Sequence, residues 1–126
     1  MDVTFYRCPI CGNIAVKVFD SGKPLVCCGV EMEELVADVT DAALEKHVPA
    51  VTREGDVLHV NVGSVDHPMT PEHYIQFICL VTDSSYQVHP LTPEDAPHAD
   101  FFVGAGETPL KVYEFCNIHG LWVKEL

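Results

Sequence analysis

Apolar and polar residues alternate over several short stretches of this chain, and turn-forming residues separate those stretches. The alternation is clearest over residues 110–115 and is typical of a half-buried β-strand. Residues 48–52 and 57–62 flank a polar turn, so they predict a β-hairpin. Further strand-like runs occupy residues 14–19, 74–82, 101–103 and 121–123. Many short strands between turns predict an all-β protein built as an antiparallel sandwich.

Two short helical turns are expected among these strands. One covers residues 42–46, with Thr40 or Asp41 as its N-cap. The other begins at Thr70 and has Pro71 in its first helical position.

The first 36 residues stand apart in this pattern. They hold four cysteines and too little apolar mass for a core of their own, so a bound metal is expected to stabilise them. The acidic run at 33–38 marks the boundary. We therefore expect a small domain over residues 1–36 and a second domain over residues 37–126. Within the second domain, residues 83–100 carry three prolines and several acids, which predicts a long surface loop.

Composition excludes several classes of function. The chain has 126 residues and a formal net charge of -12, so it lacks the basic face that nucleic-acid binding requires. No apolar stretch approaches the ~20 residues needed to span a membrane. The N-terminus does not have the pattern of a secretory signal, which predicts a cytoplasmic protein. In that reducing compartment, six cysteines favour metal ligation over disulfides.

Four of the cysteines form a first candidate metal site. Cys8 and Cys11 make a C-x2-C pair, and Cys27 and Cys28 are adjacent. Neighbouring side chains on extended backbone point in opposite directions, so the chain has to bend at Cys27–Cys28 for both sulfurs to reach one metal. The spacing alone leaves a structural zinc ribbon, a rubredoxin-like iron site and a disulfide pair as alternatives.

A second candidate site combines histidines with a fifth cysteine. His67 precedes a proline, His73 follows six residues later, and Cys116 and His119 flank a tight turn that ends in glycine. His47 lies at the start of a predicted strand. Four imidazoles and one thiolate suit iron, and they leave one octahedral position open, as in reactive metal sites. Spacing alone does not show that these distant residues converge.

The remaining histidines and the sixth cysteine have ordinary interpretations. His59, His89 and His98 are interpreted as surface or core histidines without a functional role. Cys79 lies inside the apolar run 74–82 and is interpreted as a buried core thiol.

Five motifs carry a resemblance to a known family. They are YRCPICGN at 6–13, LVCCG at 25–29, EKHVP at 45–49, HPMTPEHYI at 67–75 and CNIHGLW at 116–122. Through them the chain resembles, over essentially its whole length, the desulfoferrodoxins, the two-iron class of superoxide reductase. The resemblance implies a small desulforedoxin-like metal knuckle followed by an immunoglobulin-like β-sandwich, in a protein that is usually a homodimer.

The resemblance also implies a role for each site residue. The four N-terminal cysteines (Cys8, Cys11, Cys27, Cys28) would hold one iron in a distorted tetrahedron. The second iron would take four equatorial imidazoles and an axial thiolate (His47, His67, His73, His119 and Cys116). Glu45 would occupy the sixth position of the oxidised iron, and Lys46 would be the cationic residue beside the substrate.

The function implied is one-electron reduction of superoxide to hydrogen peroxide at the second iron in its ferrous state. An external electron donor, such as a rubredoxin, would then reduce that iron again. Two other classes of function remain alternatives: a zinc-ribbon and β-sandwich interaction module without chemistry, and an electron carrier that uses only the four-cysteine iron. A dismutase is the nearest catalytic rival, and it would need no electron donor.

Overall fold

A computed structural model describes residues 2–38 and 44–126, except for the side chains of Leu44 and Glu45. The chain divides into two compact units, Asp2–Val36 and Ala37–Leu126. The expected N-cap of the first helical turn, Thr40 or Asp41, lies outside the described residues.

The N-terminal unit consists of short antiparallel strands. One sheet has the order β2-β1-β5, and a separate hairpin pairs β3 with β4. The bounds are β1 Phe5–Arg7, β2 Ile14–Val16, β3 Val26–Cys27, β4 Val30–Glu31 and β5 Glu33–Glu34. Strand β2 is shorter than the predicted run 14–19, because its last residue, Val16, pairs with Phe5, where β1 begins. Val18 and Phe19, beyond that pair, are exposed.

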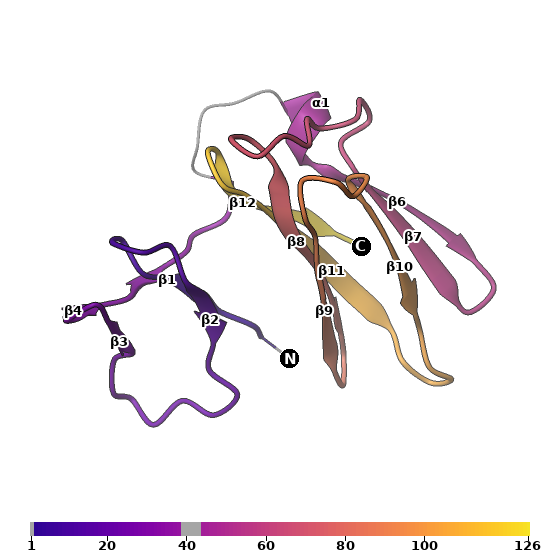
Figure 1. Cartoon of the computed structure of the whole chain (residues 1–126). Helices are drawn as coiled ribbons and strands as arrows, with labels where there is room; N and C mark the ends of the chain where they lie inside the picture. The colour runs from indigo at the N-terminus through magenta and orange to yellow at the C-terminus, as the bar shows by residue number, and fades with distance from the viewer. Residues whose placement is uncertain (1, 39–43) are drawn as a thin grey trace. The chain divides into compact units, whose positions relative to one another are not determined.

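The second unit is an immunoglobulin-like antiparallel β-sandwich, as the sequence predicted (Figure 1). One sheet has the order β10-β7-β6 and the other the order β12-β11-β8-β9. The elements are α1 Leu44–His47, β6 Pro49–Glu54, β7 Val57–Val62, β8 Ile75–Thr82, β9 Tyr86–Pro90, β10 His98–Phe102, β11 Pro109–Cys116 and β12 Gly120–Glu125. The predicted hairpin is confirmed, since β6 and β7 pair in antiparallel register.

The core lies between the two sheets. Alternate residues of β7 point inward, and Leu58, Val60 and Val62 are buried there. They join Ile78 and Leu80 of the facing sheet in one apolar cluster. Burying each such side chain stabilises the fold by roughly 1.5–3 kcal/mol, so this cluster is the rigid base on which the loops at the sheet ends are held.

Two local predictions are wrong. Residues 83–100 are not one long loop, because they contain β9 and the start of β10. Strand β9 is an exposed edge strand that ends at Pro90, which explains its weak signal. Residues 70–73 do not form a helical turn. Thr70 and His73 exchange two backbone hydrogen bonds, of 3.0 and 3.1 Å, and close a tight turn instead.

Two further observations concern single features. Cys79 is fully buried in β8, which confirms its interpretation as a core thiol. No helix in the described part of the chain is long and apolar enough to cross a membrane.

Candidate metal centres

The four N-terminal cysteines converge on one point. The sulfur atoms of Cys8, Cys11, Cys27 and Cys28, here called the four-cysteine cluster, all lie within 4.8 Å of one another. Cys11 Sγ is 3.6 Å from Cys27 Sγ, and Cys27 Sγ is 3.9 Å from Cys28 Sγ. A tetrahedral metal with bonds of ~2.3 Å would hold its thiolates about 3.8 Å apart, so the cluster has the size of a four-coordinate site.

The backbone around these cysteines bends where the sequence predicted. Cys28 and Gly29 follow each other with φ angles of 54° and 75°, in the left-handed region. This bend at the end of β3 lets the adjacent sulfurs of Cys27 and Cys28 approach the same point. In the C-x2-C turn, Gly12 has a φ of 81°, and its N–H donates to the carbonyl of Cys8 at 3.0 Å.

The chain's own groups stabilise only part of the negative charge that four thiolates would carry. The N–H of Cys11 donates to Cys8 Sγ at 3.5 Å and lowers the pKa of Cys8 to about 6. The pKa of Cys28 is raised to about 12, mainly by its contact with Cys11. A cation is therefore needed to hold all four residues as thiolates, which is the state in which they bind metal.

Four imidazole rings form a closed square in the second unit. Consecutive ring centroids are 4.7 Å apart for His47–His67, 4.7 Å for His67–His73, 5.0 Å for His73–His119 and 4.8 Å for His119–His47. The rings meet edge to face, with interplanar angles of 61° to 83°. The sulfur of Cys116 lies within 4.8 Å of donor atoms of three of them. The five residues are called the histidine–cysteine cluster below.

Three segments far apart in the sequence bring these residues together at one end of the sandwich (Figure 1). His47 ends α1, and His67 and His73 lie on the segment between β7 and β8. Cys116 ends β11, and His119 lies in the turn to β12. In that turn the N–H of His119 donates to Cys116 Sγ at 3.4 Å. This hydrogen bond fixes the position of His119 relative to the sulfur of Cys116.

The nitrogen atoms of the square are oriented for a metal. His47 Nε2 is 3.0 Å from His119 Nδ1, and two nitrogens bound at right angles to a metal ~2.1 Å away would be about 3.0 Å apart. His67 Nδ1 donates to the carbonyl of Pro68 at 2.7 Å, so its Nε2 carries the lone pair. Among the described residues, Nε2 of His67 and Nε2 of His73 are buried without a hydrogen-bond partner. Burying such atoms is costly unless a ligand satisfies them, so the donor set fits a bound metal ion.

The protonation states of three histidines of the square favour metal binding. Burial lowers the pKa of His47 and the pKa of His67 to about 4, and it also lowers the pKa of His73. These three rings are therefore neutral at pH 7 and can bind a metal through their lone pairs. Burial raises the pKa of Cys116, so a metal that binds its sulfur displaces a proton.

Two buried residues behind the square were not identified from the sequence. Glu114 Oε1 lies 3.4 Å from His47 Nδ1, and the ring of Trp122 stacks on His47 at 4.9 Å with an interplanar angle of 10°. Both are almost fully buried: Glu114 contacts the His47 ring at Nδ1, on the edge away from the square, and Trp122 covers one face of the ring. The alternation of the strand at 110–115 places Glu114 on the inward face, and that was the signal available.

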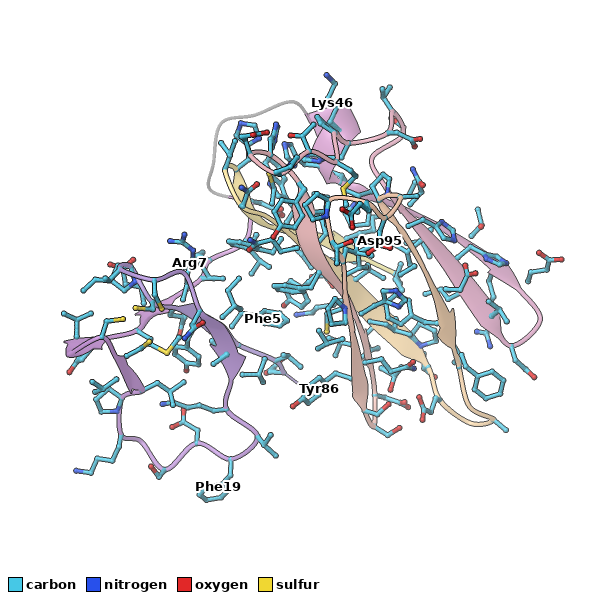
Figure 2. The ribbon with its side chains drawn as sticks, viewed as in Figure 1. Phe5, Arg7, Phe19, Lys46, Tyr86 and Asp95 are labelled. Atoms are coloured by element: carbon cyan, nitrogen blue, oxygen red, sulfur yellow. The ribbon has the colours of Figure 1, made fainter. Side chains whose placement is uncertain are left out.

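The other two predicted site residues lie on α1. Lys46 is exposed, and its side chain projects outward from the helix (Figure 2). Burial and the neighbouring histidines are the larger causes of the lowered pKa of His47, His67 and His73, and the positive charge of Lys46 adds to them, so its field reaches the square. The side chain of Glu45 lies outside the described part of the chain.

Comparisons with known proteins cover both units. A family model described as desulfoferrodoxin matches residues 39–125, and one described as the desulfoferrodoxin N-terminal domain matches residues 2–35. A desulfoferrodoxin of Syntrophotalea carbinolica is 46% identical over 121 residues, which cover 95% of this chain and 94% of that protein.

Solved structures of similar fold include superoxide reductases. The chain is similar to the superoxide reductase of Treponema pallidum, with a TM-score of 0.84 and 35% identity, over 99% of this chain and 100% of that chain. It is also similar to a shorter superoxide reductase, described as 1Fe-SOR, from Giardia intestinalis. That match has a TM-score of 0.53 and 31% identity, over 65% of this chain and 99% of the other.

Proposed function

The chain belongs to the desulfoferrodoxin family, as its motifs predicted, and from this membership and its site geometry we propose that it is a superoxide reductase. Superoxide would take up one electron and two protons at the histidine–cysteine cluster and leave as hydrogen peroxide. The names of the similar solved structures support this activity. The observation that carries it is the closed square of four imidazoles with the sulfur of Cys116 beside it.

Two iron ions are the cofactors that the two clusters fit. The four-cysteine cluster has the donor type and size of a tetrahedral iron–thiolate site. The histidine–cysteine cluster offers nitrogen and sulfur donors, which suit iron better than calcium or magnesium. Iron bound in this second cluster supplies the single electron that superoxide accepts.

The protein's own residues prepare the second cluster for an anionic substrate. An imidazole that binds a metal through its lone pair adds no charge, so the positive charge of a divalent metal would be offset there only by the thiolate of Cys116. Five donors of the chain leave one place of a six-coordinate site for the substrate. Lys46 adds a positive charge at the surface, which opposes the repulsion expected from a net charge of -12.

Solvent can deliver the two protons at the exposed edge of the square. His47 and His67 are buried, whereas His73 and His119 are only half-buried, so water reaches that side. The buried side is closed by Trp122 and Glu114. Rapid protonation from the exposed edge would release the product before its O–O bond breaks. Glu45, in α1 next to Lys46, would close the oxidised site until an electron returns.

The four-cysteine cluster could receive electrons from outside. Cys11 and Cys28 are exposed, so an electron-donor protein such as a rubredoxin can approach their sulfur atoms. We assign residues 1–36 to a four-cysteine iron module and residues 37–126 to the superoxide reductase domain. A homodimer and a location in the cytoplasm remain predictions from the sequence.

The alternative functions account for fewer of the observed features. An interaction module with one zinc ion, or an electron carrier with iron only in the four-cysteine cluster, leaves the histidine–cysteine cluster without a metal ion. Among the residues that the structure describes, the buried Nε2 atoms of His67 and His73 would then have no hydrogen-bond partner, at a cost of about 1–3 kcal/mol for each.

The stoichiometry of the reaction tests the proposed function. A known amount of superoxide is mixed with an excess of the reduced protein that contains both irons. A reductase yields one peroxide for each superoxide and oxidises one iron each time. A dismutase yields half as much peroxide, releases oxygen and leaves the protein reduced, and that result would overturn the proposal.

A further inference from the structure

Three polar side chains gather on the outer face of the sheet β10-β7-β6. His59 lies on β7, and His98 and Asp100 lie on β10, where Asp100 is the register partner of His59. Side chains alternate along a strand, so His98 and Asp100, two residues apart, lie on the same face. The buried neighbours Val60 and Ala99 point to the opposite face, into the core.

The donor atoms of these residues are close together. Asp100 Oδ1 is 2.6 Å from His59 Nδ1 and 2.7 Å from His98 Nε2, so one carboxylate oxygen contacts both imidazoles. One donor atom from each of the three residues lies within 4.8 Å of the other two. A second carboxylate, Glu54 of β6, has its Oε2 3.3 Å from His59 Nε2. Three neighbouring strands therefore contribute to this patch.

We propose that His59, His98 and Asp100 bind a divalent transition-metal cation, of which Zn²⁺ is the representative, at a third site. Two imidazole nitrogens and one carboxylate oxygen form a donor set that binds Zn²⁺, Ni²⁺ and Cu²⁺ more tightly than Mg²⁺ or Ca²⁺. The site shares no residue with either iron cluster, and the proposal does not depend on the proposed superoxide chemistry.

The size and exposure of the patch suit a Zn²⁺ ion. The donors of a tetrahedral Zn²⁺ at 2.0–2.1 Å lie about 3.3 Å apart, so Asp100 has to withdraw by under ~1 Å from its present contacts. Its side chain is 53% exposed and can make that adjustment. The side chains of His59 and His98 are 33% and 41% exposed, so a cation can enter from solvent. The net charge of -12 favours cation binding in general.

A cation at this site would connect the edge strand β10 to β7. His59 and His98 are far apart in the sequence, so the cross-link would close a long segment that contains β8 and β9. Binding to the folded state alone stabilises it in proportion to the logarithm of cation concentration. Zn²⁺ should therefore raise the melting temperature of the protein, and this effect should require His98.

Calorimetric titration of the two-iron protein with ZnCl₂ tests the site. We expect one Zn²⁺ to bind for each chain while both visible iron bands stay unchanged. His98→Gln and Asp100→Asn should each weaken this binding by about ten-fold or more. His89→Gln is the matched control, because His89 is an exposed histidine on β9 outside the patch. Its affinity should equal that of the wild type.

Several outcomes would overturn the proposal. One is Zn²⁺ binding that His98→Gln and Asp100→Asn leave unchanged. Another is the absence of saturable binding below millimolar Zn²⁺, which would leave the patch as a hydrogen-bonded His–Asp cluster. Half a Zn²⁺ for each chain, with dimers appearing in size-exclusion chromatography, would place the cation between two molecules instead. Before Zn²⁺ is added, equal melting curves of the two-iron variants and the two-iron wild type would establish that the variants are folded.

Discussion

Asn117 and Tyr74 are joined by two hydrogen bonds. The N–H of Tyr74 donates to Asn117 Oδ1 at 2.9 Å, and the N–H of Asn117 donates to the carbonyl of Tyr74 at 3.2 Å. Asn117 Nδ2 also donates to the carbonyl of Glu72 at 2.9 Å. These contacts clamp the segment that carries His73 to the turn that carries Cys116 and His119. Two of these three hydrogen bonds come from the amide side chain of Asn117.

Replacing Asn117 by alanine should loosen this clamp. It removes two side-chain hydrogen bonds on both sides of His73, so the square of imidazoles should lose its fixed geometry. We expect the affinity of the histidine–cysteine cluster for iron, or its rate with superoxide, to fall by about ten-fold or more. Iron analysis and pulse radiolysis would measure the two effects.

Gln87→Ala is the control for that change. Gln87 also connects two segments through its amide, by donating to the carbonyl of Phe102 at 2.8 Å, and this hydrogen bond involves no residue of the histidine–cysteine cluster. Iron content and rate should remain those of the wild type. Similar losses in both variants would mean that Asn117 stabilises the fold in general and does not position His73.

Two cysteine variants should separate the clusters. Cys11→Ser removes a ligand of the four-cysteine cluster, so the visible band of that iron should be lost while reduced protein still consumes a single pulse of superoxide. Cys116→Ser should have the opposite result, because it removes the thiolate beside the four imidazoles. Loss of the fast reaction in well-folded Cys11→Ser protein would mean that superoxide reacts at the four-cysteine cluster and not at the histidine–cysteine cluster.

Much of the sandwich was predictable because its strands alternate. β7 is half-buried and shows an alternating pattern that fixes its inward residues, Leu58, Val60 and Val62. β9 was missed because an exposed edge strand has no buried face to impose a pattern, and Pro90 suggested a loop. The sequence predicts a helical turn at Thr70 where the structure has a tight turn, because threonine followed by proline can begin either a helix or a turn.

The sites were predictable only where ligands are close in the sequence. The C-x2-C pair and Cys116 with His119 are local, but the pairing of α1 with the β7–β8 segment is set by the fold. Motif resemblance, not spacing, therefore identified His47 and His67 as partners. His59 and His98 had ordinary interpretations because their proximity depends on the pairing of β7 with β10, and residues 98–100 fell within the expected loop.

The proposed role of Glu45 leads to an asymmetric effect. If Glu45 closes only the oxidised site, Glu45→Ala should leave the first reaction of reduced protein with superoxide nearly unchanged. The oxidised site should instead take up water or added anions more readily, which visible spectra during an azide titration would report. A large fall in the second-order rate constant for superoxide would contradict the role.

Cys79 should resist alkylation in the folded protein. Burial raises its pKa to about 12, whereas an unperturbed thiol titrates near 8.5, so it stays protonated and enclosed at pH 9. A raised acid pKa also means that this thiol favours the folded state fully below about pH 8.5 and loses that contribution as pH rises toward 12. Mass spectrometry after iodoacetamide treatment at pH 7 to 9 should find Cys79 unlabelled. Labelling as fast as in urea would show that the core around β8 opens readily.

Lys46 offers the sharpest test of how an anionic substrate reaches this acidic protein. The net charge of -12 should repel superoxide, so fast capture needs a local positive potential. Lys46 is exposed on α1, immediately before His47, and its charge contributes to the lowered pKa of three histidines of the square. Steering by such local fields changes association rates by ~10-fold to 10³-fold. Lys46→Ile should therefore slow the bimolecular reaction by about ten-fold or more.

The dependence on salt distinguishes steering from a structural effect of this substitution. Salt screens the attraction between Lys46 and superoxide, so the wild-type rate should fall as ionic strength rises, and the rate of Lys46→Ile should fall less. Lys124→Ile is the matched control, because it removes the same charge from an exposed position near the far end of β12. Its rate and its salt dependence should stay close to those of the wild type. Pulse radiolysis of all three proteins at several ionic strengths provides the comparison. If Lys46→Ile and Lys124→Ile behave alike, only the net charge matters and Lys46 has no special part in capture.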